Sequence, residues 1–131
     1  MPNYEQPYHR LLAAAKAAQR RAHAPYSQFR VGAALLTKSG QIYTGCNVEN
    51  ASYGLTICAE RVAVTKAVSE GHRQFQAIAV IAPSKALSPC GACRQFLAEF
   101  GDLTVLCADS RNLQRVQTYR LSELLPHAFE L

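Results

Sequence analysis

Three cysteines and one glutamate have the residue types and spacing of a metal site that could perform acid–base chemistry. Cys90 and Cys93 are three residues apart, so at the start of a helix their sulfurs would lie on one side and could share an ion. Cys58 would supply a third sulfur from another helix. Three protein ligands leave one zinc position open to water, whereas a closed structural zinc site normally takes four. The pattern therefore predicts one reactive zinc ion per chain.

Glu60 lies two residues after Cys58. Positions i and i+2 of a helix do not face each other, so Glu60 is a poor ligand for the same ion and a better proton carrier beside it. The alternative is a first-turn glutamate that is favoured only by the helix dipole. The neighbouring metal ligands favour the catalytic interpretation.

Charge compensation is the next requirement, because three thiolates around a divalent zinc leave a net negative site. The N-termini of the two helices would offset part of that charge. Arg61 and Arg94 each follow a motif residue and could donate to the sulfurs, although either could be an ordinary exposed helix arginine. We favour Arg61.

The remaining cysteines, Cys46 and Cys107, fall on predicted strands and are interpreted as small buried hydrophobic residues. A redox role for Cys90 and Cys93 is a competing interpretation. It would leave Cys58 and Glu60 unexplained.

Composition limits the class of protein. The chain has 131 residues, 49% of them hydrophobic, which fits a single domain over 1–131. Its first residues lack the basic start and apolar stretch of a secretory signal, and its apolar runs are too short for a bilayer, so we expect a cytoplasmic protein without membrane contact. The formal charge of +5 comes from scattered side chains without interleaved aromatic residues, which makes nucleic-acid binding unlikely.

Hydrophobic periodicity predicts helices that alternate with strands. Too few residues separate the last two strands for a helical crossover, so these should be antiparallel. The expected fold is a three-layer α/β/α domain with a mixed sheet of about five strands. Helices are expected at Tyr4 to Arg21, Cys58 to Glu70, Cys90 to Phe100 and Ser122 to Leu125, and strands at Phe29 to Leu36, Gln41 to Cys46, Phe75 to Ala82, Leu103 to Ala108 and Val116 to Tyr119.

Several motifs together resemble one family, the small homotetrameric zinc cytidine deaminases of pyrimidine salvage. They are Ala24-Pro25-Tyr26-Ser27 with Phe29, Val31-Gly32-Ala33-Ala34, Asn47-Val48-Glu49-Asn50, Cys58-Ala59-Glu60-Arg61, Ser88-Pro89-Cys90-Gly91-Ala92-Cys93-Arg94-Gln95, and Leu125-Pro126 to Phe129. The resemblance implies the family's fold and the hydrolysis of cytidine or deoxycytidine to uridine or deoxyuridine and ammonia. Zinc-activated water would attack C4 of cytosine while Glu60 carries protons to N3 and to the departing ammonia.

The resemblance also implies substrate contacts. The backbone around Ala59 and Ser88 would position the pyrimidine edge, and Phe29 would lie against the base, although residue type alone suggests strand core for Phe29. Tyr53 and Phe129 would complete the site of a neighbouring subunit in a homotetramer; alternatively they are a surface tyrosine and part of a mobile chain end.

Asn47 and Glu49 alternate along an extended segment, so both can present polar groups on one side, as ribose recognition requires. A solvated turn is the alternative. The Asn47 and Glu49 pair also argues against a close rival, an aminonucleoside-antibiotic deaminase of the same fold. A rival of another class is a structural zinc module that binds RNA, which would hold zinc without turnover.

Overall fold

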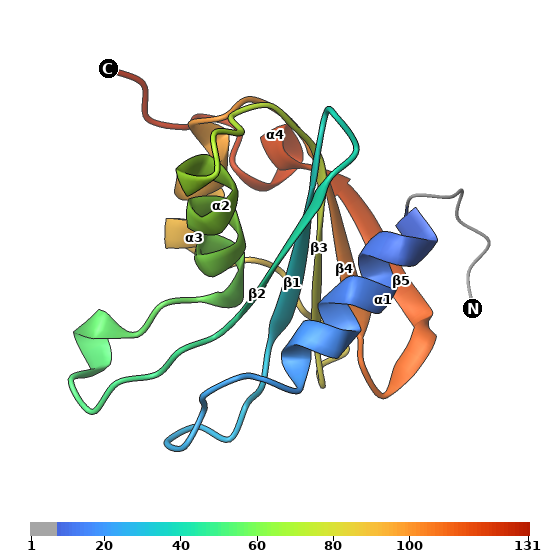
Figure 1. The fold of residues 1–131 in the computed structure, drawn as a ribbon, viewed down its shortest axis with the longest axis vertical. Coiled ribbons are helices and arrows are strands. Elements are labelled where there is room, and N and C mark those ends of the chain that lie inside the picture. Colours follow the sequence, from blue (N-terminus) through green and yellow to red (C-terminus); the bar gives the residue numbers. More distant parts are fainter. Residues whose placement is uncertain (1–7) are drawn as a thin grey trace.

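The computed structural model describes residues 8–131, which form a five-stranded sheet in the order β2-β1-β3-β4-β5. Figure 1 shows α1 on one face of this sheet and α2 and α3 on the other. The mixed α/β sheet with flanking helices is as predicted. The elements are α1 (Tyr8–Gln19), β1 (Gly32–Thr37), β2 (Ile42–Cys46), the 3-10 turn η1 (Tyr53–Leu55), α2 (Ala59–Ser69), β3 (Phe75–Ala82), α3 (Gly91–Ala98), β4 (Thr104–Asp109), β5 (Asn112–Arg120) and α4 (Leu121–Leu124).

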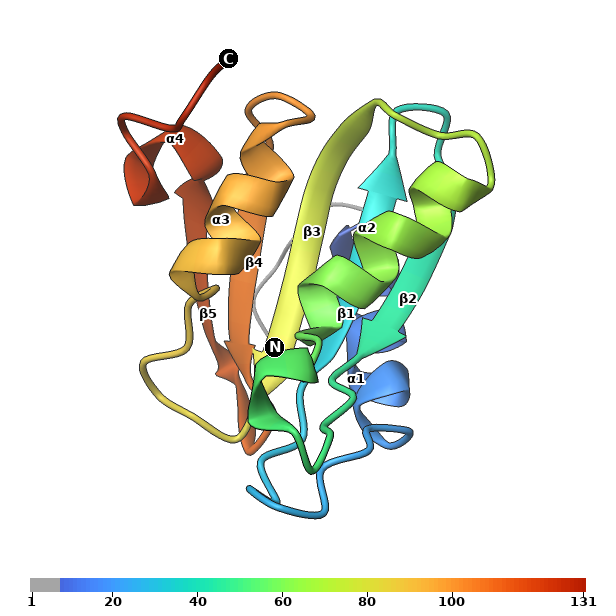
Figure 2. The same cartoon turned by 90° about the vertical axis from the view of Figure 1, so that its left-hand side faces the viewer.

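The parallel pairing of β3 with β4 determines at which end of the sheet α2 and α3 begin. β3 and β4 run parallel, whereas β1 pairs antiparallel with both β2 and β3, and β5 pairs antiparallel with β4. The helix α2 precedes β3 and α3 precedes β4, so both helices run back along the same face of the sheet. Figure 2 shows α2 and α3 side by side with their N-terminal ends at the same end of the sheet. That arrangement brings two helix N-termini together.

The sheet has a buried hydrophobic core on each face. Alternate residues of β3 contribute side chains to the two cores. Ile78 and Val80 lie on the side of α2 and α3, and Ala79 and Ile81 lie on the side of α1. A strand covered on both faces reads as a continuous apolar run, as the sequence Phe75–Ala82 does. The central strand is therefore a rigid base for the helices that it supports.

The prediction of a strand from Phe29 is wrong at its start, because β1 begins only at Gly32. The segment before β1 is an irregular loop in which Gln28 has a positive φ of 58°. At the other end of the chain, β5 is nine residues long and therefore extends beyond the predicted Val116 to Tyr119. The predicted start of the first helix at Tyr4 lies outside the described residues.

Within residues 8–131, none of the helices has both the length and the apolar character needed to cross a membrane.

Candidate active site

The three motif cysteines lie together at the adjoining starts of α2 and α3. Cys58 is the N-cap of α2, Cys90 is the N-cap of α3, and Cys93 follows within the first turn of α3. Their sulfurs all lie within 4.8 Å of one another, and the Cys58 and Cys90 sulfurs are 3.8 Å apart. They are the single group of potential metal ligands found among residues 8–131, and Glu60 is not part of it.

The electrostatics of this cluster favour an anionic sulfur at Cys58. The hydrogen bond from the Cys93 thiol and a second one from Arg61 lower the pKa of Cys58 to about 5. In the same pair the Cys93 thiol, which donates and is buried, has a raised pKa. The Arg61 Nη2 group donates to the Cys58 sulfur at 3.5 Å, and the pKa of Arg61 is raised by this contact.

The residues present fit a zinc ion. Three sulfurs at this spacing are the soft ligand set that zinc accepts. The Arg61 guanidinium donates to the Cys58 sulfur through Nη2, while its Nε group is buried and has no hydrogen-bond partner in the described part of the chain, so this cation lies where thiolate ligands would balance its charge. Cys107, with 3% of its surface exposed, is buried as predicted, whereas Cys46 is only half-buried.

Glu60 lies in the first turn of α2 beside the sulfurs, with only 4% of its surface exposed. Burial, reinforced by the nearby charge of Cys58, raises the pKa of Glu60 to about 7. Glu60 is thus a buried carboxyl group beside the potential metal ligands and outside their group.

Comparison with known proteins agrees with this geometry. Residues 5–109 match the family described as the cytidine and deoxycytidylate deaminase zinc-binding region. The chain is 53% identical to the cytidine deaminase of Halalkalibacterium halodurans over 126 residues, which cover 91% of each protein. It is 48% identical to that of Sporosarcina psychrophila over 123 residues, covering 92% of this chain and 89% of the relative.

The chain belongs to the cytidine deaminase family of zinc-binding hydrolases. The fold agrees as well. The crystal structure of cytidine deaminase from Burkholderia pseudomallei matches with a TM-score of 0.90 at 47% identity, covering 95% of this chain and all of the other.

In this deaminase, backbone pairing joins the loops to the start of α2. Val48 pairs antiparallel with Ile57, the residue before Cys58, and it also pairs parallel with His23. The backbone of Glu49 donates to the carbonyl of His23 at 2.8 Å. The segment that carries Asn47 and Glu49 therefore lies beside the start of α2 and its Cys58, although its sequence contains no strand pattern.

The side chains of Asn47 and Glu49 bind the loop before β1. Asn47 is buried, accepts from the Val31 backbone at 2.9 Å and donates to the Phe29 carbonyl at 2.8 Å. Glu49 accepts from the Ser27 backbone at 3.1 Å and from the Ser27 hydroxyl. The hydrogen bond from the Ser27 hydroxyl is the main reason that the pKa of Glu49 is lowered. Both residues thus fix the loop that presents Phe29, which is 38% exposed.

The other residues implied by the resemblance differ in how far they are exposed to solvent. Ala59 is fully buried at the start of α2, and Ser88 is exposed just before Cys90. Tyr53 is 75% exposed and its ring contacts Tyr26 at 5.9 Å between centroids, next to a hollow of about 370 Å³ that Glu49 also lines. Phe129 is 72% exposed, and its backbone forms two hydrogen bonds with the side-chain amide of Gln95.

Two residues have structural roles that the sequence interpretation did not assign. Ser27 connects Glu49 to the loop, and its hydroxyl also accepts from the Phe29 backbone at 3.0 Å. The sequence contains part of this information, because a serine hydroxyl often accepts from the backbone N–H two residues later and so forms a turn. Arg94 makes its hydrogen bonds to oxygen atoms and not to the sulfurs, so Arg61 is the arginine that donates to the cluster.

Proposed function

We propose that the chain catalyses the hydrolytic deamination of cytidine and deoxycytidine to uridine and deoxyuridine, with release of ammonia, as a step of pyrimidine salvage. It would do so as a single domain over 1–131 with the three-layer α/β/α fold of its family. The observation that carries the proposal is the cluster of three sulfurs within 4.8 Å beside a buried carboxyl group that is not a ligand. The names of the relatives support the choice of substrate.

Cys58, Cys90 and Cys93 would hold one zinc ion. When bound, zinc supplies the Lewis acidity that makes water a nucleophile near neutral pH. The Arg61 guanidinium would stabilise the thiolate form of the ligands, because it already donates to the Cys58 sulfur at 3.5 Å.

Glu60 would move the protons. As the water oxygen bonds to C4 of the cytosine, the Glu60 carboxylate takes one proton from it and passes that proton to N3. It then takes the second proton and delivers it to the amino group, so that the bond from C4 to nitrogen breaks and ammonia leaves. The product keeps oxygen at C4 and hydrogen at N3, which is the uracil ring.

The remaining residues would bind the nucleoside. The backbone of Ala59 and Ser88 would contact the pyrimidine edge, Phe29 would pack against the base, and Asn47 and Glu49 would contact the ribose. The side-chain amide of Asn47 can form four hydrogen bonds and makes two within residues 8–131, so it could form further ones with the ribose.

Assembly would complete each site. Tyr53 and Phe129 are largely exposed in the single chain, and burying them against a neighbouring copy would remove apolar surface from water. We propose a homotetramer in which these two residues line the adjoining subunit's pocket.

The test is the loss of absorbance at the cytosine band with cytidine as substrate, with and without a zinc chelator. Glu60→Gln should retain about one zinc per chain and lose turnover by ~100-fold or more. Glu70→Gln, at the far end of the same helix, is the matched control and should behave as the unaltered chain does. An active Glu60→Gln variant would exclude the proton-transfer role.

Two further outcomes separate the alternatives. Zinc binding without turnover of any cytosine nucleoside would favour a structural zinc module. Free cytosine should be a far poorer substrate than cytidine, and equal rates would remove the ribose roles of Asn47 and Glu49.

A further inference from the structure

Arg94 uses each nitrogen of its guanidinium for a different oxygen. Its Nε donates to the Pro89 carbonyl at 2.8 Å, its Nη2 donates to the Ser88 hydroxyl at 3.0 Å, and its Nη1 donates to the Leu124 carbonyl at 2.8 Å. Leu124 lies 30 residues further along the chain, so the arginine joins two separate segments. The side chain is half-buried, which limits competition from water.

The first of these segments presents a metal ligand. Between the end of β3 at Ala82 and the start of α3 at Gly91 the chain has no regular structure, and Cys90 ends this loop as an exposed residue. The two residues immediately before Cys90 are the ones that Arg94 holds. A loop without a backbone ladder depends on such side-chain contacts to fix its end.

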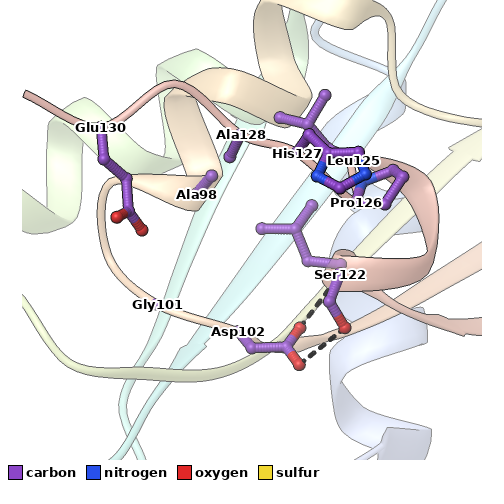
Figure 3. A pocket seen from close by; sticks show the side chains of 10 residues that line it. Ala98, Gly101, Asp102, Ser122, Leu125, Pro126, His127, Ala128 and Glu130 are labelled. Atoms are coloured by element: carbon purple, nitrogen blue, oxygen red, sulfur yellow. Dashed lines mark hydrogen bonds between the residues drawn. The ribbon is translucent and has the colours of Figure 1, made fainter.

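The second segment is the C-terminal part of the chain. The side-chain amide of Gln95 pairs with the backbone of Phe129, accepting from its N–H at 3.0 Å and donating to its carbonyl at 3.1 Å. A hollow of about 450 Å³, shown in Figure 3, lies between the end of α3 and this segment, lined by residues that include Ala98, Pro126 and Ala128. Close packing is interrupted at this hollow, and the hydrogen bonds of Arg94 and Gln95 attach the segment to α3, in addition to those that join Ser122 to Asp102.

We infer that Arg94 is a positioning residue for the metal site: it ties the loop that presents Cys90 to the C-terminal segment at Leu124, so that zinc affinity depends on this tie. The inference rests on the proposed zinc site. Arg94 follows Cys93 directly, and a displacement of the loop would move Cys90 relative to both other sulfurs. The C-terminal segment thereby stabilises the metal site through Arg94.

The geometry distinguishes this role from charge compensation. An arginine that acted only through its positive charge could be replaced by lysine. A lysine ammonium is a single point on a flexible stem and cannot reach three oxygens that are arranged around a planar guanidinium. Lysine at position 94 should therefore keep the charge and lose the positioning.

The experiment measures zinc affinity by competition with a chromophoric chelator, and the melting temperature of the zinc-free protein, for the full chain. Arg94→Lys should raise the zinc dissociation constant by ~10-fold or more. The control is Arg10→Lys on α1, on the opposite face of the sheet, which should leave it unchanged. Ser88→Ala removes one contact from an exposed position and should give a smaller increase, and it decides the question if Arg94→Lys does not fold.

Each remaining outcome counts against the inference. Zinc affinity of Arg94→Lys within about twofold of the unaltered chain would overturn it, including the case in which only the melting temperature of the zinc-free protein falls. If Arg94→Lys does not fold and Ser88→Ala binds zinc as the unaltered chain does, the inference is equally overturned. If the unaltered chain binds no zinc, the proposed function itself fails and the inference fails with it.

Discussion

Gly45 should be indispensable, although it carries no functional group. It lies in β2 directly under α2, the helix that begins at Cys58 and carries Glu60. A Cβ atom at position 45 would lie 2.4 Å from the carbonyl oxygen of Ala59 and 2.6 Å from the backbone nitrogen of Ala63. Both are backbone atoms, so no side-chain rotation can relieve the contact. Gly45→Ala must move the helix away from the strand.

The size of the movement follows from the contact distance. Carbon to oxygen contacts begin at ~3.3 Å, so Gly45→Ala must separate the strand and the Ala59 carbonyl by roughly 1 Å. Overpacking of this kind costs about 1–3 kcal/mol, which lowers the melting temperature by about 4–12 °C for a domain of this size. A displacement of about 1 Å at a catalytic group can reduce the rate by ~100-fold.

The assay combines thermal unfolding, zinc content and cytidine turnover for Gly45→Ala. Gly54→Ala is the control, because a Cβ there meets nothing within 4 Å and should leave the melting temperature unchanged or slightly higher. The reasoning is refuted if Gly45→Ala melts within about 2 °C of the unaltered chain and retains its turnover. In that case the strand and the helix would have more freedom than their close approach indicates.

Three further predictions concern stability and substrate binding. The pKa of Asp109 is lowered chiefly by a hydrogen bond from Arg111, so its ionised form stabilises the fold above the usual carboxyl pKa and that contribution is lost as the pH falls through the lowered pKa. Asp109→Asn should therefore melt below the unaltered chain at neutral pH, with the gap closing below about pH 4; a gap that stays constant would contradict this. Ser27→Ala removes a donor to Glu49 and should raise the KM for cytidine more than it lowers kcat, and a change in kcat alone would be the contrary result. Stripping zinc with a chelator should lower the melting temperature and added zinc should restore it, whereas identical melting curves would argue against a site in the folded chain.

The convergence of Cys58, Cys90 and Cys93 could be predicted because its determinants are mainly local. Cys90 and Cys93 share one helical turn, and both cysteine motifs follow loops, which is where helices begin. The position of Cys58 depends on the chain's path through β3, but the alternation of helices and strands already favours two helices on one face of a sheet. That Glu60 lies outside the group of potential ligands was predictable from its spacing of two residues from Cys58 along a helix, and its proton-carrying role stays a prediction.

The loop before β1 could not be predicted in the same way. The apolar residues around Phe29 favour a strand, yet the backbone there bonds to the side chain of Asn47, 18 residues away. Glu49 similarly binds Ser27 across 22 residues. Hydrogen bonds between a side chain and a distant backbone leave no periodic pattern in a sequence, so the sequence does not distinguish this loop from the start of a strand.

The length of β5 was underestimated for a different reason. The strand is at the edge of the sheet and most of its residues are exposed, so polar side chains such as Gln114 and Arg115 interrupt the alternation that marks a half-buried strand. β5 pairs with β4 through backbone N–H and C=O groups, which are present whatever the side chains are, so this pairing leaves no pattern in the sequence.

At the N-caps of α2 and α3, helix stability and metal binding favour different residues. Helices usually begin at Ser, Thr, Asp or Asn, whose side-chain oxygen binds a free backbone N–H, and losing such a cap costs about 0.5–2 kcal/mol. Cys58 and Cys90 occupy these two positions and form no side-chain cap bond. Serine or aspartate at either position would cap its helix but remove a sulfur, so the stability gained from the cap would be offset by the loss of the bound ion that stabilises the folded chain.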